Sequence, residues 1–177
     1  MKRVSGNTKL VDIQEVYYEG YGPSGIAFYV YCLTDNKNRT SSDVKATFTK
    51  NNGSIGNPGS VSYLFERKGV FELSGNKDDI VDFAINNNCI DVTEQYDNIV
   101  LEVIPTEYIN FKDKVEKKEF QIISSDLPFL PKTNIVINSE EFIKVTNLLE
   151  ALEDLDDVQE VYTNFDIEDN ELEIILK

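Results

Sequence analysis

The sequence predicts an α+β protein with two α/β sandwich-like domains, one of them a ferredoxin-like module inserted into the other. Two observations carry this prediction. Residues 69–123 show strand and helix patterns in the order β-α-β-β-α-β, which is that of a ferredoxin-like module. The flanking residues supply β-α-β before position 69 and α-β after position 138, so strands of the first part stay unpaired until the chain returns. We therefore expect a discontinuous domain of residues 1–68 and 134–177, and an inserted domain of residues 69–133.

The first thirty-three residues predict a leader and an antiparallel hairpin. Residues 1–9 are polar and lack helical periodicity. From Leu10 to Tyr18 apolar and polar side chains partly alternate, which is typical of a strand. A turn cluster follows, made of Gly20, Gly22, Pro23 and Gly25. Residues 26–33 are apolar or aromatic and carry no charge, which predicts a strand buried on both faces.

A short helix and another strand complete the first part. Thr40 with Asp43 forms a capping pair at the helix start, because a hydroxyl and a carboxylate can satisfy free amides of the first turn. Val44 and Phe48 give the helix one apolar stripe, and an Asn-Asn-Gly stop ends it. After a loop, residues 61–65 are expected to form the strand.

The inserted module has four predicted strands, over residues 70–73, 90–93, 99–104 and 120–123. Its two predicted helices carry apolar stripes, made of Ile80, Phe83 and Ala84 in one and of Tyr108, Phe111 and Val115 in the other.

The last part predicts a linker, a long helix and a strand. Residues 127–133 contain two prolines and form the linker. Asn138 with Glu141 marks a helix start. The clearest amphipathic stripe of the chain follows, made of Phe142, Val145, Leu148, Leu149, Leu152 and Leu155. Residues 158–162 predict a strand, and the acidic tail ends in a β-prone segment, 172–176.

Composition limits the class of protein. The 177 residues hold no apolar run long enough for a membrane span, and the start lacks the apolar core of a secretory signal. We therefore expect no membrane partner and a cytoplasmic location. Cys32 and Cys89 lie in apolar surroundings, which favours buried free thiols over a disulfide or redox pair.

The charge is unevenly distributed. The net charge is -15, but residues 1–68 carry +3 and residues 69–177 carry -18. This asymmetry is expected either for two domains with different solubilising surfaces, which charge alone favours, or for one face that binds an anionic partner.

Catalytic and metal-binding patterns are weak. The chain has no histidine, which removes the commonest general base and metal ligand, and the cysteines lack metal-site spacing. The densest carboxylate run is explained better by a solvated helix face than by a divalent-ion site: Glu150, Glu153, Asp154, Asp156 and Asp157. The glycine cluster precedes a strand and not a helix, so it is a turn and not a phosphate loop. We expect no catalytic residue, no metal site and no cofactor.

The most informative polar residues flank a helix start, where phosphate oxygens bind well. The candidate nucleic-acid-binding residues are Asn36, Lys37, Asn38, Arg39 and Thr40, extended by Lys45, Arg67 and Lys68. Stacking faces for bases are candidates at Tyr17, Tyr18 and Tyr21. The alternative is a soluble loop with ordinary helix capping.

Four motifs carry a family resemblance: EGYGPSG at 19–25, LTDNKNRT at 33–40, GSVSYLFERKGV at 59–70 and LLEALEDLDDVQEVYTN at 148–164. With them the chain resembles the YebC/PmpR family, which is related to the mitochondrial translational activator of cytochrome oxidase. The resemblance implies a basic helical N-terminal domain followed by two α/β domains, one inserted in the other. Here the helical domain is lacking, so we expect a fragment, a truncated form or a degenerate copy.

The resemblance implies a non-enzymatic regulator of gene expression that binds DNA, together with the missing domain. Two alternatives remain. The same basic surface could bind ribosomal RNA on the ribosome, as a translational activator would, with the acidic half contacting protein. The chain could instead be a protein-interaction module whose acidic helix, residues 139–157, docks a basic partner. A mitochondrial location is expected if a longer precursor exists.

Overall fold

The structure is a computed structural model and describes residues 12–176. The chain divides into two compact units, the first joining Met1–Phe65 to Pro131–Lys177 and the second formed by Glu66–Leu130. The predicted leader lies outside the described residues. None of the helices within residues 12–176 has the length and apolar character that crossing a membrane requires.

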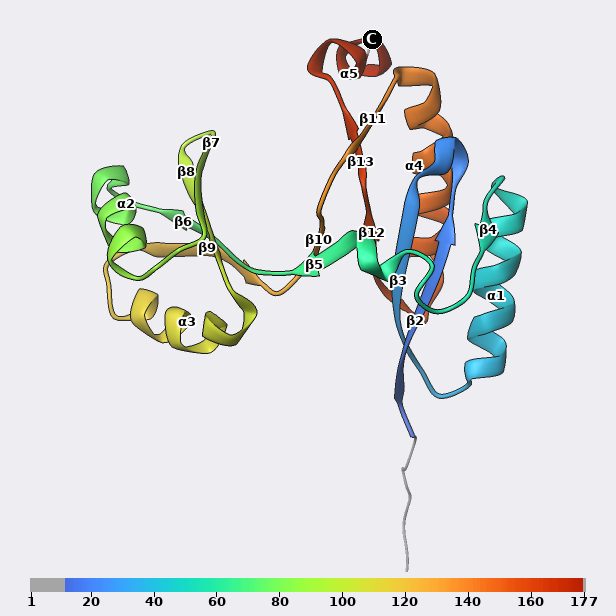
Figure 1. The fold of residues 1–177 in the computed structure, drawn as a ribbon, viewed down its shortest axis with the longest axis horizontal. Helices are drawn as coiled ribbons and strands as arrows, with labels where there is room; N and C mark the ends of the chain where they lie inside the picture. The colour runs from blue at the N-terminus through green and yellow to red at the C-terminus, as the bar shows by residue number, and fades with distance from the viewer. Residues whose placement is uncertain (1–11, 177) are drawn as a thin grey trace, which may run out of the picture. The chain divides into compact units, whose positions relative to one another are not determined.

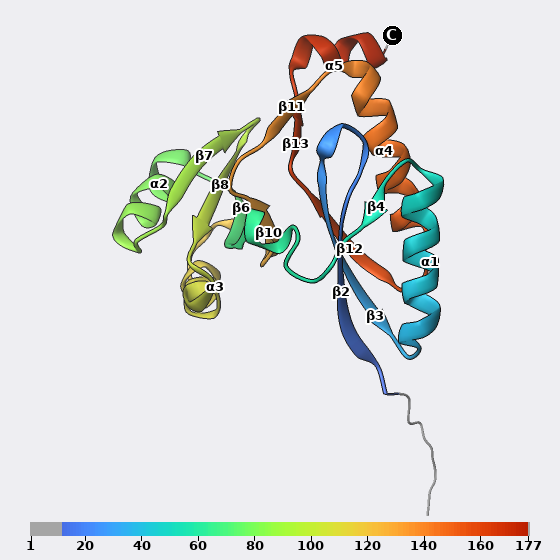
Figure 2. The ribbon, with the colours of Figure 1, turned by 45° about the vertical axis from the view of Figure 1, so that its right-hand side comes forward.

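The first unit is a four-stranded antiparallel sheet with two helices packed on one face (Figure 1). The strands run in the order β12 (Val158–Thr163), β3 (Ala27–Thr34), β2 (Gln14–Tyr21) and β4 (Ser54–Ile55). The helices α1 (Lys37–Lys50) and α4 (Ser139–Glu153) lie side by side in both ribbon views (Figure 2). This is the fold that the paired hairpin and the late return of helix and strand predict.

The core of the first unit follows from two periodicities. Alternate residues of β3 point to the same face of the sheet, so Phe28, Val30 and Cys32 are all buried against the helices. Each helix buries a stripe at helical spacing, and the buried residues are Val44 and Phe48 of α1 and Val145, Leu148 and Leu152 of α4. The capping box predicted at Asn138 and Glu141 is present, and both hydrogen bonds are made.

The opposite face of this sheet is partly covered by the segment that follows α1. The Glu19 carboxylate accepts hydrogen bonds from the backbone N–H groups of Gly59, Val61 and Ser62, at 2.8, 2.9 and 2.7 Å. Phe65 then stacks on Tyr29, with ring centroids 5.9 Å apart. The Glu19 carboxylate therefore fastens this segment to the sheet.

The remaining elements of the first unit form a small extension. β11 (Ile135–Ile137) pairs in parallel with β13 (Phe165–Ile167), and α5 (Asp169–Leu176) contacts α4. The backbone N–H of Ser139 donates a 2.8 Å hydrogen bond to the Glu171 carboxylate, which joins the first turn of α4 to α5.

The second unit is ferredoxin-like, which confirms the predicted fold class. Its elements are β6 (Gly69–Ser74), α2 (Lys77–Asn86), β7 (Asp91–Gln95), β8 (Asn98–Val103), α3 (Tyr108–Glu116) and β9 (Gln121–Asp126). The sheet order is β7-β8-β6-β9, and every neighbouring pair is antiparallel. The predicted stripes of both helices are buried except at Tyr108, which is half-buried and stacks on Phe71.

The two segments that pass between the units pair with each other. β5 (Phe65–Arg67) and β10 (Phe129–Pro131) form a separate two-stranded sheet. Backbone hydrogen bonds from Lys132 to Leu64 (2.9 Å) and from Lys68 to Pro128 (3.1 Å) fix an antiparallel pairing. The predicted linker of residues 127–133 therefore contains a short strand. Among residues 12–176 there are also three short 3₁₀ helices, at Pro23–Gly25, Ser62–Leu64 and Pro105–Glu107.

Several sequence-based element predictions were wrong. Residues 61–65 are a 3₁₀ helix and its flanks, because Glu19 captures consecutive N–H groups that a strand would use for pairing. The tail at 172–176 is the end of α5 and not a strand. The strand at 26–33 is not buried on both faces, since Tyr29, Tyr31 and Leu33 are only half-buried. Both cysteines are free, as predicted, but only Cys32 is fully buried.

Candidate nucleic-acid interface

Helix α1 begins one turn earlier than the sequence predicted. Asn36 is the N-cap, and its side-chain oxygen accepts a 3.1 Å hydrogen bond from the Arg39 backbone N–H. The Asn36 N–H in turn donates to the Thr34 hydroxyl at 2.9 Å. Asparagine is among the best N-cap residues because its oxygen reaches these free amides. Thr40 is therefore inside the helix, and the predicted Thr40–Asp43 capping pair is wrong.

The buried Thr40 and the exposed Arg39 both contact Asp157, in the turn that follows α4. The Thr40 hydroxyl lies 2.7 Å from both Asp157 Oδ2 and the Thr34 hydroxyl. Its single proton belongs with the charged acceptor, Asp157, and the Thr34 hydroxyl can then donate to Thr40. Arg39 Nη2 lies 3.1 Å from Asp157 and 3.0 Å from Asp35.

These contacts shift the ionisation of the pair. The Thr40 hydroxyl, followed by the Arg39 guanidinium, holds the pKa of Asp157 below its ordinary value. The hydrogen bonds to Asp157 and then to Asp35 raise the pKa of Arg39. Two carboxylates therefore already compensate the Arg39 charge. Asp157 lies just after the C-terminus of α4, where the helix dipole disfavours a carboxylate, and its contacts with Thr40 and Arg39 of α1 oppose that effect.

The candidate binding residues around the start of α1 and the carboxylate run of residues 150–157 meet at a cavity of about 490 Å³. It is lined by Arg39, Thr40, Asp43, Asp154, Leu155, Asp156 and Asp157. Four carboxylates against one guanidinium make it acidic, so it disfavours phosphate. Within residues 12–176, no group of three or more acidic or cysteine side chains is arranged to hold a metal ion.

A different face of α1 keeps its positive charge. Thr40, Val44 and Phe48 are buried, whereas positions 37–39, 41–43, 45, 46, 49 and 50 of the helix are exposed. We call the following set the outer face of α1: Lys37, Asn38, Ser41, Ser42, Lys45 and Thr49. Among the described residues neither lysine forms an ion pair. Sequence analysis missed the two serines, which helical spacing from Lys37 and Lys45 could have indicated.

Arg67 and Lys68 belong to the second unit, and both are engaged there. Lys68 Nζ lies 3.0 Å from Glu102 and 3.2 Å from Glu66, and these hydrogen bonds raise its pKa. Arg67 Nε donates to the Leu127 carbonyl at 2.9 Å, and its guanidinium lies 4.8 Å from the centre of the Phe129 ring. Arg67 therefore holds the segment that leads into β10, and Lys68 joins the end of β5 to β8.

The candidate stacking tyrosines have other roles. Tyr17 is stacked on Tyr29 and Tyr31, with centroid distances of 5.0 Å to each. Tyr18 packs against the helical core, and burial raises its pKa. The Tyr21 hydroxyl donates to the Ser60 carbonyl at 3.2 Å. The faces of Tyr17 are therefore used within the sheet.

Comparison with known proteins gives consistent matches. A family model described as the TACO1/YebC second and third domain matches residues 13–165. A relative from Thermotoga maritima, named a probable transcriptional regulatory protein, is 41% identical and covers 99% of this chain and 71% of its own. One of the same name from Trichlorobacter lovleyi is 37% identical, over 98% and 71%. A crystal structure of a conserved hypothetical protein from Aquifex aeolicus superposes with a TM-score of 0.79 at 40% identity. That match covers 89% of this chain and 66% of the Aquifex chain.

Proposed function

The chain belongs to the TACO1/YebC family, and we propose that it is a non-enzymatic regulator of gene expression that binds DNA through the outer face of α1. The names of its relatives support a regulatory role. The chain spans about two thirds of the Aquifex protein. Any activity or partner of such a longer protein is therefore only proposed for this chain.

The observation that carries the proposal is the pair of exposed lysines of α1, Lys37 and Lys45, that form no ion pair among the described residues. Lys37 and Lys45 are eight residues apart, which is about 12 Å along a helix. This matches the width of the DNA major groove, about 12 Å, so each ammonium can reach one of the two bordering backbones. The short side chains of Ser41 and Ser42 lie between them, let the helix approach closely, and can donate to phosphate oxygens.

The other predicted residues act mainly by support in this proposal. Asn36 caps the helix and Thr40 anchors it, while Arg39 holds the turn after α4. Asn38 is exposed beside Lys37 and can contact the backbone. Arg67 and Lys68 stabilise the second unit. The carboxylates around the cavity at Asp157 disfavour phosphate contact on that side of α1.

Salt dependence tests the proposal directly. Two phosphate contacts predict that log K falls with log salt at a slope of about -1.8 for duplex DNA. The Lys37→Ala/Lys45→Ala variant should bring the slope close to zero. The matched control, Lys132→Ala/Lys144→Ala, removes the same charge from exposed positions elsewhere and should keep the slope. Equal slopes for the two variants would overturn the proposal.

Ribosomal RNA offers the same phosphate chemistry. Binding to ribosomes that depends on Lys37 and Lys45, without measurable binding to duplex DNA, would assign the same face to RNA. If reversing both lysines to glutamate leaves function intact and neutralising Glu150, Glu153 and Asp154 abolishes it, the chain is a protein-interaction module.

A further inference from the structure

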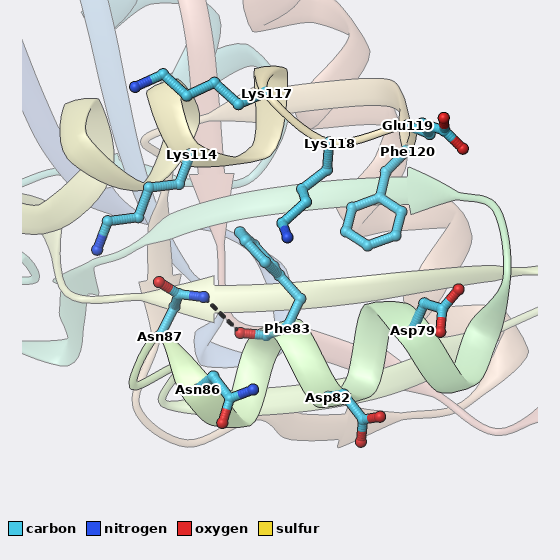
Figure 3. Close-up of a pocket in the computed structure, with 10 residues that line it drawn as sticks. All are labelled: Asp79, Asp82, Phe83, Asn86, Asn87, Lys114, Lys117, Lys118, Glu119 and Phe120. Atoms are coloured by element: carbon cyan, nitrogen blue, oxygen red, sulfur yellow. Dashed lines mark hydrogen bonds between the residues drawn. The ribbon is translucent and has the colours of Figure 1, made fainter.

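The second unit contains a pocket that the α1 proposal does not use. It lies between α2 and the end of α3, and its volume is about 720 Å³, within the range of small-molecule sites, about 300–1,000 Å³. It is lined by Asp79, Asp82, Phe83, Asn86, Asn87, Lys114, Lys117, Lys118, Glu119 and Phe120 (Figure 3).

Two phenyl rings form the apolar part of the pocket. Phe83 and Phe120 meet edge to face, with centroids 5.6 Å apart and ring planes at 70°. Phe83 is 7% exposed and Phe120 is half-buried, so both rings are held by the core and still reach the pocket. A flat aromatic group can lie against them without displacing either side chain.

Cations reach into the pocket from the α3 side. The ammonium groups of Lys114 and Lys118 point toward α2, whereas Lys117 points away (Figure 3). Lys118 Nζ lies 5.9 Å from the centre of the Phe83 ring. Among the described residues none of the three lysines forms an ion pair, although the chain as a whole is strongly acidic. Lysines near a helix C-terminus are favoured by the dipole, but the dipole does not account for the rings beneath them.

The α2 side offers hydrogen-bonding groups. The Asn87 amide donates a 2.8 Å hydrogen bond from Nδ2 to the Phe83 carbonyl, which fixes the side chain with its oxygen available as an acceptor. Asp79 and Asp82 lie on the same wall and disfavour an anion there. The pocket therefore has a lysine-bearing side, an aromatic floor and an accepting side.

We propose that this pocket binds a nucleotide, with the phosphate at Lys114 and Lys118, the base against Phe83 and Phe120, and a base or ribose donor at Asn87. Lysine suits phosphate as a compact charge, and phenyl rings stack on any base. The nucleotide is either free or an unstacked unit of a single strand. No residue of the pocket belongs to α1, so the inference stands independently of DNA binding there.

The test is a titration of the full chain with AMP, adenosine and inorganic phosphate, followed by amide NMR shifts. We expect AMP to shift resonances of α2 and residues 117–120, and to bind at least about tenfold more tightly than adenosine or phosphate, since each of these makes only part of the contacts. Lys114→Ala/Lys118→Ala and, separately, Phe120→Leu should each weaken AMP by about tenfold or more. The Lys37→Ala/Lys45→Ala variant should bind AMP as the unchanged protein does.

A single-stranded oligoadenylate, added to the Lys37→Ala/Lys45→Ala variant, distinguishes the two sources. Competition with AMP assigns the pocket to a strand, and absence of competition assigns it to a free nucleotide. The inference is overturned if AMP shifts no resonance near Phe83, if phosphate alone binds as tightly, or if removing Lys114 and Lys118 has no effect.

Discussion

The Thr40 hydroxyl donates a 2.7 Å hydrogen bond to the Asp157 carboxylate, across 117 residues of sequence. It joins the first turns of α1 to the turn after α4 and, with Arg39, fixes the helix that carries the proposed DNA contacts. The stability of the first unit and the charge of α1 are therefore coupled through one carboxylate.

Replacing Asp157 should separate these effects. Asp157→Asn removes the charge opposite Arg39, and we expect a loss of about 1–3 kcal/mol in the free energy of unfolding, measured in urea. Arg39 then keeps only the exposed Asp35, so the salt slope of DNA binding should steepen. The neighbouring Asp156→Asn is the control, expected within about 0.5 kcal/mol of the unchanged protein. A stable Asp157→Asn protein would show that the pair contributes little.

Glu19 should make stability depend on acid. Burial raises its pKa, but hydrogen bonds from the backbone N–H groups of Gly59, Val61 and Ser62 lower it more, so the pKa of Glu19 lies below its ordinary value. Such a group stabilises the folded state above its unfolded pKa, and this contribution is lost as pH falls through the lower folded pKa. Glu19→Gln should cost about 1–3 kcal/mol at pH 7 and reduce the fall in stability between about pH 5 and pH 3.

Urea unfolding at pH 7 measures the cost of the substitution, and urea unfolding at about pH 5 and about pH 3 measures the acid dependence. Glu160→Gln, on an exposed position of β12, serves as the control and should follow the unchanged protein. An acid profile that Glu19→Gln leaves unaltered would contradict the prediction.

Gly20 is required by packing and not by phosphate binding. A Cβ there would lie 2.6 Å from the Ser54 carbonyl oxygen and 2.9 Å from the Phe48 ring. Backbone on one side prevents relief, so Gly20→Ala should destabilise by about 1–3 kcal/mol in thermal unfolding. Gly25→Ala meets no atom within 4 Å but has φ of +72°, and should cost about 1–2 kcal/mol from strain alone. Neither variant should alter nucleotide binding.

The two thiols should be nearly inert in the folded protein. Burial raises the pKa of Cys32 to about 12 and that of Cys89 to about 11, so little thiolate exists at pH 8. We expect labelling by a disulfide reagent to be slow until urea unfolds the chain. Cys89, which is half-buried, should react before Cys32. Rapid labelling of one thiol per chain in the absence of denaturant would disprove this prediction.

Local signals predicted most of the fold. The capping box at Asn138 and Glu141 and the stripes of Val44/Phe48 and Phe83/Ala84 lie within a few residues of the elements that they specify. These signals also identified the ferredoxin-like order. That residues 1–68 with 134–177 and residues 69–133 fold as independent domains stays a prediction.

The failures involve distant partners. Thr40 and Asn36 are both good N-cap residues, and the contacts that bury Thr40 come partly from Asp157, which is 117 residues away in the sequence. The segment 172–176 belongs to α5, and Glu171 of this helix accepts a hydrogen bond from the start of α4, a contact across 32 residues that local signals do not contain. Similarly, Lys114 and Phe120 acquire a common pocket with α2 only through the tertiary fold.

The antiparallel pairing of β5 with β10 brings together the two places where the chain enters and leaves the second unit. The segments that enter and leave it are hydrogen-bonded neighbours, so the two connections lie about one strand spacing apart, about 4.8 Å. A two-residue turn can join neighbouring antiparallel strands at that spacing. If the units fold independently, as we predict, the second unit can vary in sequence and length while the fold around α1 and α4 is kept.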